Sequence, residues 1–180
     1  ELRAVGEVMA LATKRRTRVL TIRGDYGIGK TRLLVEVERR LRKGGYNVGW
    51  QMAACPPRGT ELPLSGVVSM IQALCGISDG DSESRVRDVE PRLRALGLHT
   101  EEVAATLSVL GAQTGAAPSD VSFVLRNAFV RMISSLAEDR LHLFAWDSAH
   151  TMDAESLAIL DYAVNKLPAA RIVFVLAARA

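Results

Sequence analysis

The chain has 180 residues, of which 48% are hydrophobic, and its formal net charge is +3. This length and hydrophobic content indicate one globular domain with a sizeable core. The net charge is too small to indicate a nucleic acid or a membrane surface as a partner, and no apolar run approaches the length that crosses a bilayer.

The first residue and the two cysteines suggest the setting of the chain. Glu rather than Met stands first, so we expect residues 1–180 to be a single domain, truncated at both ends of a longer protein. Cys55 and Cys75 have neither metal-ligand spacing nor a neighbouring His, which is typical of thiols in a reducing compartment, and a disulfide between them stays an alternative. There is no secretory signal, so we expect a cytoplasmic protein.

The first third of the chain predicts a helix, a strand, a glycine-rich loop and a second helix. Apolar residues at helical spacing over residues 2–12 predict an amphipathic helix. Residues 19–22 (Val-Leu-Thr-Ile) are a short apolar run that predicts a buried strand. Apolar residues then recur at helical spacing from Leu33 to Leu41, and Gly44 with Gly45 is a helix stop signal.

The loop between this strand and helix carries a phosphate-binding motif. Residues 24–31 match G-x-x-x-x-G-K-[ST], the Walker A pattern, and the flanking strand and helix distinguish it from a flexible glycine turn. Glycines let the backbone wrap closely around an anion, and successive amides with a helix N-terminus then point at it. We expect Lys30 to reach the β- and γ-phosphates and Thr31 to hold Mg²⁺. The residues predicted to contact the nucleotide are Gly24, Asp25, Tyr26, Gly27, Ile28, Gly29, Lys30, Thr31 and Arg32.

Three further strands are predicted from their apolar patterns. Residues 46–52 alternate large apolar with small or polar side chains, which indicates a strand at a sheet edge. Residues 141–146 and 172–177, like residues 19–22, are nearly continuous in apolar residues and are typical of central parallel strands covered on both faces.

The segments between these strands are helical in pattern. Helices are predicted at residues 64–77, 85–96 and 101–110, and a long one from Ser119 to near residues 139–140. A last helix begins after an Asp153 cap with Leu157, Leu160, Val164 and Leu167 on its buried face. The alternation predicts an α/β fold, a P-loop NTPase three-layer sandwich with a mostly parallel central sheet. An all-helical insertion, at about residues 64–136, lies between the second and third predicted strands.

A second motif follows the strand at residues 141–146. Asp147 stands directly after this strand, as the Walker B aspartate that holds Mg²⁺ does. Ligands of open parallel sheets lie at the carboxyl ends of the strands, so we expect Asp147 and the phosphate loop to face one crevice. Thr31 and Asp147 are therefore the predicted metal ligands, and Lys30 and Asp147 are predicted to be essential to catalysis.

The residues around Asp147 resemble a known family signature. Residues 146–157 (Trp-Asp-Ser-Ala-His-Thr-Met-Asp-Ala-Glu-Ser-Leu) resemble the D-D-x-H-x-x-D-x-x-S-L pattern of AAA+-like STAND ATPases, found in LuxR-type and kinase- or cyclase-associated bacterial regulators. Residues 27–34 are also typical of that group. The resemblance implies a signalling switch that uses ATP and Mg²⁺, with Arg179 as the sensor of the γ-phosphate. It also implies appended lid and effector domains as partners, and a nucleotide-dependent homo-oligomer.

The chain departs from the family pattern at one position. The family commonly has a second acidic residue after the metal-binding Asp, where this chain has Ser148. A hydroxyl is not a comparable base at neutral pH because it holds its proton too tightly. Ser148 would orient a water only by hydrogen bonding, and Asp153 is the other candidate for that task. Slow hydrolysis, and a nucleotide-stabilised interaction module without turnover, are therefore both open.

Two other classes of P-loop protein fit the sequence less well. A GTPase has Asp-x-x-Gly at the metal site, whereas residues 147–150 end in His150. Residues 165–168 (Asn-Lys-Leu-Pro) have Pro where a guanine-reading motif has Asp. A P-loop small-molecule kinase would need an acceptor pocket and lid arginines, which the pattern does not identify.

Overall fold

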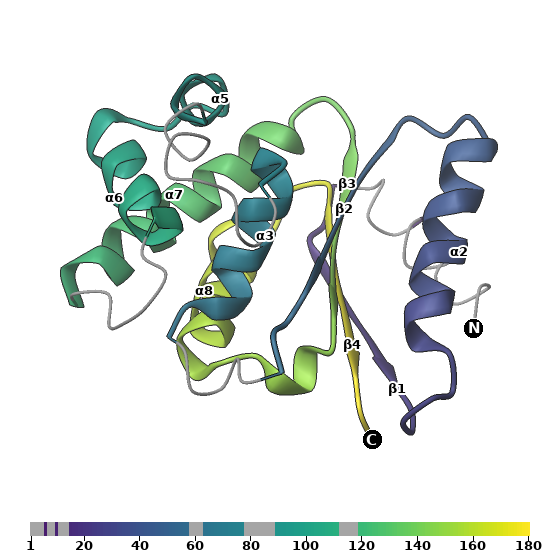
Figure 1. Cartoon of the computed structure of the whole chain (residues 1–180). Coiled ribbons are helices and arrows are strands. Elements are labelled where there is room, and N and C mark those ends of the chain that lie inside the picture. Colours follow the sequence, from purple (N-terminus) through teal and green to yellow (C-terminus); the bar gives the residue numbers. More distant parts are fainter. Residues whose placement is uncertain (1–5, 7–9, 11–14, 58–62, 78–88, 112–118) are drawn as a thin grey trace.

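A computed structural model describes residues 6, 10, 15–57, 63–77, 89–111 and 119–180 (Figure 1). The helix predicted over residues 2–12, and the first residues of the one predicted over 85–96, lie mostly outside these ranges. No helix in the described part of the chain has the length and apolar character needed to cross a membrane.

The centre of the fold is a four-stranded sheet in which every strand pair is parallel. Its strands are β1 (Arg18–Arg23), β2 (Val48–Ala54), β3 (Leu141–Asp147) and β4 (Ile172–Ala178). Their spatial order is β1-β4-β3-β2. The apolar strands β3 and β4 are central and β2 lies at one end of this order, as their patterns predict.

β1 lies at the other end of this order, which makes the prediction of a central, doubly covered strand wrong. Leu20 and Ile22 pack against the core on one side, but Val19 is 49% exposed. An apolar run of four residues does not distinguish burial on one face from burial on both. The neighbouring elements decide it, and within the described chain β1 pairs only with β4.

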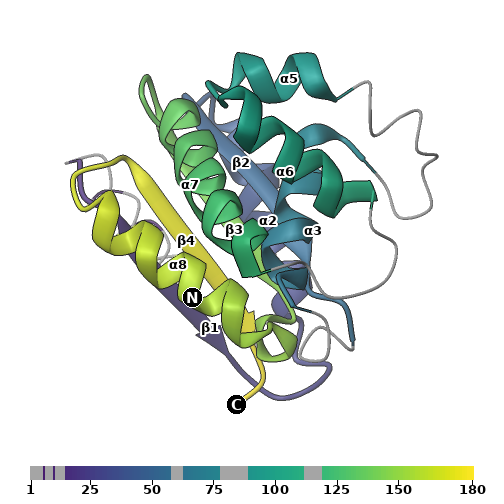
Figure 2. The same cartoon turned by 90° about the vertical axis from the view of Figure 1, so that its left-hand side faces the viewer.

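Helices cover both faces of the sheet. α2 (Lys30–Lys43) lies on one face, and α3 (Ser65–Cys75), α7 (Ser119–Leu136) and α8 (Ala154–Lys166) lie on the other (Figures 1 and 2). α5 (Glu90–Ala95) and α6 (Thr100–Gly111) form the outer part of that second layer. One buried apolar cluster lies on each side of the sheet. The three-layer α/β sandwich is therefore confirmed, as is the helical insertion between β2 and β3.

α8 begins as predicted and buries most of the predicted face. The Asp153 side chain caps it by accepting a hydrogen bond from the Ser156 amide at 2.8 Å. Leu157, predicted on the buried face, is 45% exposed. Leu160 is buried and Val164 and Leu167 pack against the core, as predicted, and the buried face also includes Ser156, Ile159 and Ala163.

His142 has a structural place inside the sheet. It lies in β3, is buried, and stacks on Phe144 with ring centroids 4.6 Å apart. Its neighbour in β2 is Gly49, where a Cβ atom would come within 2.2 Å of His142 Nδ1. Only glycine leaves room for the imidazole there. Burial, and then the nearby Arg140 cation, lower the pKa of His142 from 6.5 to about 4, against a smaller opposing effect of the Leu136 carbonyl.

This pKa predicts a loss of stability in mild acid. The unfolded chain binds a proton at His142 below about pH 6.5, whereas the folded chain does so only near pH 4, so the proton favours unfolding across this window. We expect this group to lower the free energy of unfolding by about 3 kcal/mol between about pH 7 and pH 4. Denaturant unfolding at several pH values, compared with His142→Leu, measures this contribution. An NMR titration that places the pKa of His142 at or above 6.5 would contradict it.

Candidate functional site

The carboxyl ends of three parallel strands bring the predicted site residues to one end of the sheet. β1 leads into residues 24–29, which connect it to α2, and β3 ends at Asp147. β4 lies between these two strands and runs into Arg179. The loop and the metal-site candidate therefore share the edge where open parallel sheets bind ligands.

The backbone of the loop depends on its glycines. Gly27 and Gly29 have φ angles of 78° and 97°, in the left-handed region that side chains rarely adopt. Gly29 precedes α2 and provides no side-chain cap, and the first turn of that helix holds no acidic residue. The amides at the start of α2 are thus left for another acceptor, which makes this helix end suited to an anion.

Lys30 folds back over the loop. Its ammonium donates hydrogen bonds of 2.8 Å to the carbonyl oxygens of both Gly24 and Asp25. An ammonium has three donors, so one hydrogen remains after these two contacts. The charge is therefore held at the mouth of the loop by backbone groups and not by a carboxylate.

Thr31 and Asp147 meet although they are 116 residues apart in the sequence. Thr31 Oγ1 donates a hydrogen bond of 2.6 Å to Asp147 Oδ2, and Asp147 Oδ1 accepts one of 2.8 Å from the Ser148 amide. A hydroxyl and a carboxylate in contact fit Mg²⁺, which binds through one or two protein oxygens together with waters and phosphates. In the described part of the chain, no group of three or more His, Cys, Asp or Glu residues forms an all-protein metal cage.

Arg179 lies beside the loop. Its guanidinium carbon is 5.1 Å from the centre of the Tyr26 ring, within the range of a cation–π contact. The next residue, Ala180, donates its amide to the Gly24 carbonyl at 3.3 Å. The loop side chains Tyr26 and Ile28 are 85% and 68% exposed, and Arg32 is exposed on the first turn of α2.

Ser148 has an unusual backbone conformation for a non-glycine residue. Its φ of 57° and ψ of 34° are left-handed, and its carbonyl accepts hydrogen bonds from both the amide and the hydroxyl of Thr151. Within the described residues, the Ser148 hydroxyl has no hydrogen-bond partner. His150 lies on the short 3-10 turn that follows (Ala149–Thr151) and is exposed.

Asp153 is not available to orient a water, which corrects that alternative. It is only 4% exposed, and its two oxygens accept four hydrogen bonds, from Leu64 N, Ser65 Oγ, Gly66 N and Ser156 N. Burial alone raises the pKa of Asp153, but the hydrogen bonds from Ser156, Gly66 and Leu64 outweigh it and hold the pKa below its ordinary value of 3.8. The carboxylate therefore stays ionised and committed to the starts of α3 and α8.

Sequence reasoning missed this link between α3 and Asp153. The residue at the N-cap of α3 is Leu64, which has no side-chain acceptor and a φ of 64°. Ser65, at the start of the predicted helix, is a residue type that often caps helices, so the sequence does not indicate that an acceptor is missing there. Only the structure shows that Leu64 precedes the helix and that Asp153 provides the acceptor.

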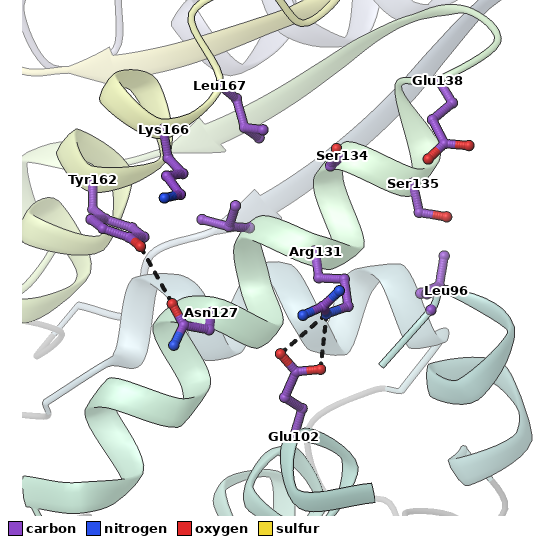
Figure 3. Close-up of a pocket in the computed structure, with 12 residues that line it drawn as sticks. Leu96, Glu102, Asn127, Arg131, Ser134, Ser135, Glu138, Tyr162, Lys166 and Leu167 are labelled. Carbon is purple, nitrogen blue, oxygen red and sulfur yellow. Dashed lines mark hydrogen bonds and ion pairs between the residues drawn. The ribbon is translucent and has the colours of Figure 1, made fainter. Parts of the chain in front are cut away.

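A hollow of about 540 Å³ lies away from these residues (Figure 3). It is lined by α7, α8 and the turn between α5 and α6, and it reaches the C-terminal end of α8 at Lys166 and Leu167. The Arg131–Glu102 ion pair, at 3.0 Å, and the Tyr162–Asn127 hydrogen bond, at 3.4 Å, cross its surface. The phosphate loop does not contribute to it, so the hollow is no part of the candidate site.

Comparison with known proteins agrees with this geometry. No curated protein matches the chain significantly. The family profile described as the AAA ATPase domain matches residues 1–175, a range that includes the loop, Thr31 and Asp147 but ends before Arg179. The match covers nearly the whole chain, and the parallel three-layer sandwich is the fold that it implies. The chain therefore belongs to the AAA ATPase domain family.

Proposed function

We propose that the chain is a Mg-ATP-binding switch domain of STAND type, part of a larger bacterial signalling or transcriptional regulator. The observation that carries the proposal is the 2.6 Å contact between Thr31 and Asp147, because it joins the two halves of a P-loop metal site. The family membership supports nucleotide binding and ATPase chemistry. The STAND assignment rests on the resemblance of residues 146–157.

Each site residue has a proposed task. The loop amides and Lys30 bind the phosphates, and Lys30 exchanges its contacts with the Gly24 and Asp25 carbonyls for phosphate oxygens. Thr31 and Asp147 hold Mg²⁺, which neutralises charge on the β- and γ-phosphates when bound. Arg179 is the γ-phosphate sensor, and its place over Tyr26, beside the loop, supports that task.

The structure supports ATP over GTP at this site. The guanine-like segment, residues 165–168, lies at the C-terminal end of α8. The Pro168 carbonyl accepts a hydrogen bond from the Thr17 amide, just before β1 begins, whereas the phosphate loop follows the other end of that strand. β1 has six residues and so spans about 20 Å. Asn165 and Lys166 therefore lie too far away to contact the base of a nucleotide whose phosphates are bound by the loop.

A second candidate function is an interaction module that binds nucleotide without turnover. Ser148 favours it, because the position after Asp147 lacks the carboxylate that the family uses to polarise water. The backbone of Ser148 is already bonded to Asp147 and Thr151, which orients the turn but provides no base. A measurement of ATP hydrolysis distinguishes the two candidate functions, whereas a measurement of nucleotide binding does not, because both bind nucleotide.

Nucleotide binding predicts a stabilisation that depends on Lys30. Mg-ATP at about a hundred times its dissociation constant adds roughly 2.7 kcal/mol of stability, which for a chain of this size raises Tm by about 5–10 °C. We expect Lys30→Ala to weaken ATP binding at least about tenfold, because a charge-assisted contact is worth about 1.5–3 kcal/mol. Lys43→Ala, at the exposed far end of the same helix, is the matched control. Thermal melts with and without Mg-ATP test this, and an equal shift for Lys30→Ala and wild type would refute it.

Ser148 predicts how turnover responds to a restored carboxylate. Ser148→Asp places an acidic group beside Asp147 in a left-handed conformation that Asp tolerates. We expect kcat for ATP hydrolysis to rise at least about tenfold, with little change in ATP affinity, because general base catalysis contributes about 10²–10⁴-fold. Ser148→Asn has the same shape without the charge and should leave kcat unchanged. Equal rates for Ser148→Asp and wild type would show that the missing carboxylate does not limit turnover.

A further inference from the structure

The segment that carries Asp147 is held at both ends by the start of α3. The Trp146 Nε1 atom, immediately before Asp147, donates a hydrogen bond of 2.7 Å to the Gly66 carbonyl. The Asp153 carboxylate, after the turn, accepts one of 3.2 Å from the Gly66 amide. One residue of α3 therefore contacts both flanks of residues 147–152.

Further hydrogen bonds extend this contact. Asp153 Oδ1 accepts the Leu64 amide at 2.9 Å and the Ser156 amide at 2.8 Å, so a single carboxylate caps both α3 and α8. Ser156 Oγ accepts the Val67 amide at 3.0 Å. Three amides at the start of α3, those of Leu64, Gly66 and Val67, are thus satisfied by residues that follow Asp147 in the chain.

The contact is buried and tightly packed. Trp146 and Ser156 are 0% exposed. A Cβ atom at Gly66 would come within 2.7 Å of Met152 Cγ and 3.2 Å of Ser156 Cβ, so the backbone of α3 approaches this turn more closely than a side chain permits. Removing one partner would leave buried polar groups unpaired, which costs more than an ordinary surface contact.

On its N-terminal side, Asp147 is held by the sheet. It is the last residue of β3, it pairs with Ala54 of β2, and its carbonyl accepts the Cys55 amide at 2.9 Å. On its C-terminal side the chain leaves the sheet at Ser148, whose amide bonds to Asp147 Oδ1. The course of this turn is fixed by the contacts of residues 146 and 153 with Gly66.

We propose that Trp146, Asp153 and Ser156 are positioning residues that hold Asp147 in place for a metal–nucleotide complex by anchoring residues 147–152 to the first turn of α3. The proposal rests on the proposed role of Asp147 as a metal ligand. Groups that orient a metal ligand typically contribute about 10–100-fold to metal affinity or activity. Loss of these contacts with α3 should therefore weaken the Mg²⁺-dependent part of ATP binding. The part of the ATP affinity that comes from the phosphate loop should not change.

Asp153→Asn is the sharpest test, because it keeps the cap of α8 and removes the acceptor of the Gly66 amide at the start of α3. One oxygen remains for the amides of Ser156 and Leu64, since Asn caps helices as well as Asp does. The new NH₂ group cannot accept a hydrogen bond from Gly66 N, whereas Ser65 Oγ can turn and accept one from it. Asp161→Asn is the matched control, because Asp161 is exposed on the same helix and, among the described residues, its carboxylate bonds only to the side chain of Asn165.

The measurement is the ratio of ATP affinity in Mg²⁺ to ATP affinity in EDTA, by titration of a fluorescent ATP analogue. We expect Asp153→Asn to lower this ratio about tenfold, towards the value for Asp147→Asn, with the affinity in EDTA unchanged. Asp161→Asn should keep the wild-type ratio. A purely structural role would lower Tm and leave the ratio unchanged, and that result would overturn the proposal.

Two further measurements cover the case in which Asp153→Asn does not fold. Ser156→Ala removes a single acceptor, that of the Val67 amide, and should lower the ratio by a smaller factor. In the wild type, hydrogen exchange at residues 64–67 should slow with Mg-ATP more than with ATP in EDTA. An unchanged ratio for Ser156→Ala together with equal exchange would overturn the proposal. A wild type whose ATP affinity does not depend on Mg²⁺ would instead refute the proposed function itself.

Discussion

The hydrogen bond between Thr31 and Asp147 is the constraint on which the candidate site depends. It joins the start of α2 to the end of β3, across β4, which lies between β1 and β3 with all three strands parallel. Parallel strands need long crossovers. Here α2 joins β1 to β2, the helical insertion joins β2 to β3, and α8 joins β3 to β4. The architecture thus places one hydroxyl and one carboxylate beside the N-terminus of a helix, where anions bind favourably.

The residues after Asp147 divide into two groups with different physical tasks. Asp147 and Ser148 face the loop edge of the sheet, and their backbone forms the turn that orients the carboxylate. Asp153 and Ser156 face inward, are buried, and satisfy amides of α3. A motif that resembles a single catalytic signature therefore combines a site with its support. A buried carboxylate is tolerated there because four hydrogen bonds compensate for its desolvation.

Most of the fold could be predicted from local pattern. The two errors, at β1 and at Leu157, both concern burial, which depends on the elements that pack against a strand or helix. The edge position of β2 and the central positions of β3 and β4 were predicted correctly, because alternation and continuous apolar runs reflect how many faces are covered. β1 was misplaced because a run of four residues, three of them apolar, is too short to indicate how many faces of the strand are covered. Leu157 was misassigned because two overlapping stripes fit α8, and only the packing of α8 against α3 and α7 selects one of them.

The sequence by itself determined what depends on neighbours along the chain. Glycines at 27 and 29 permit the left-handed turns of the loop, Lys30 lies within reach of the carbonyls at 24 and 25, and Asp153 caps the helix that follows it. Only the tertiary structure decided which distant groups meet. Arg179 lies over Tyr26, Thr31 contacts Asp147, and Asp153 provides the cap that α3 lacks, 89 residues away. Local dihedral preferences and hydrogen bonds can be derived from adjacent residues, whereas these contacts depend on the order of the strands and on the packing of the helices over them.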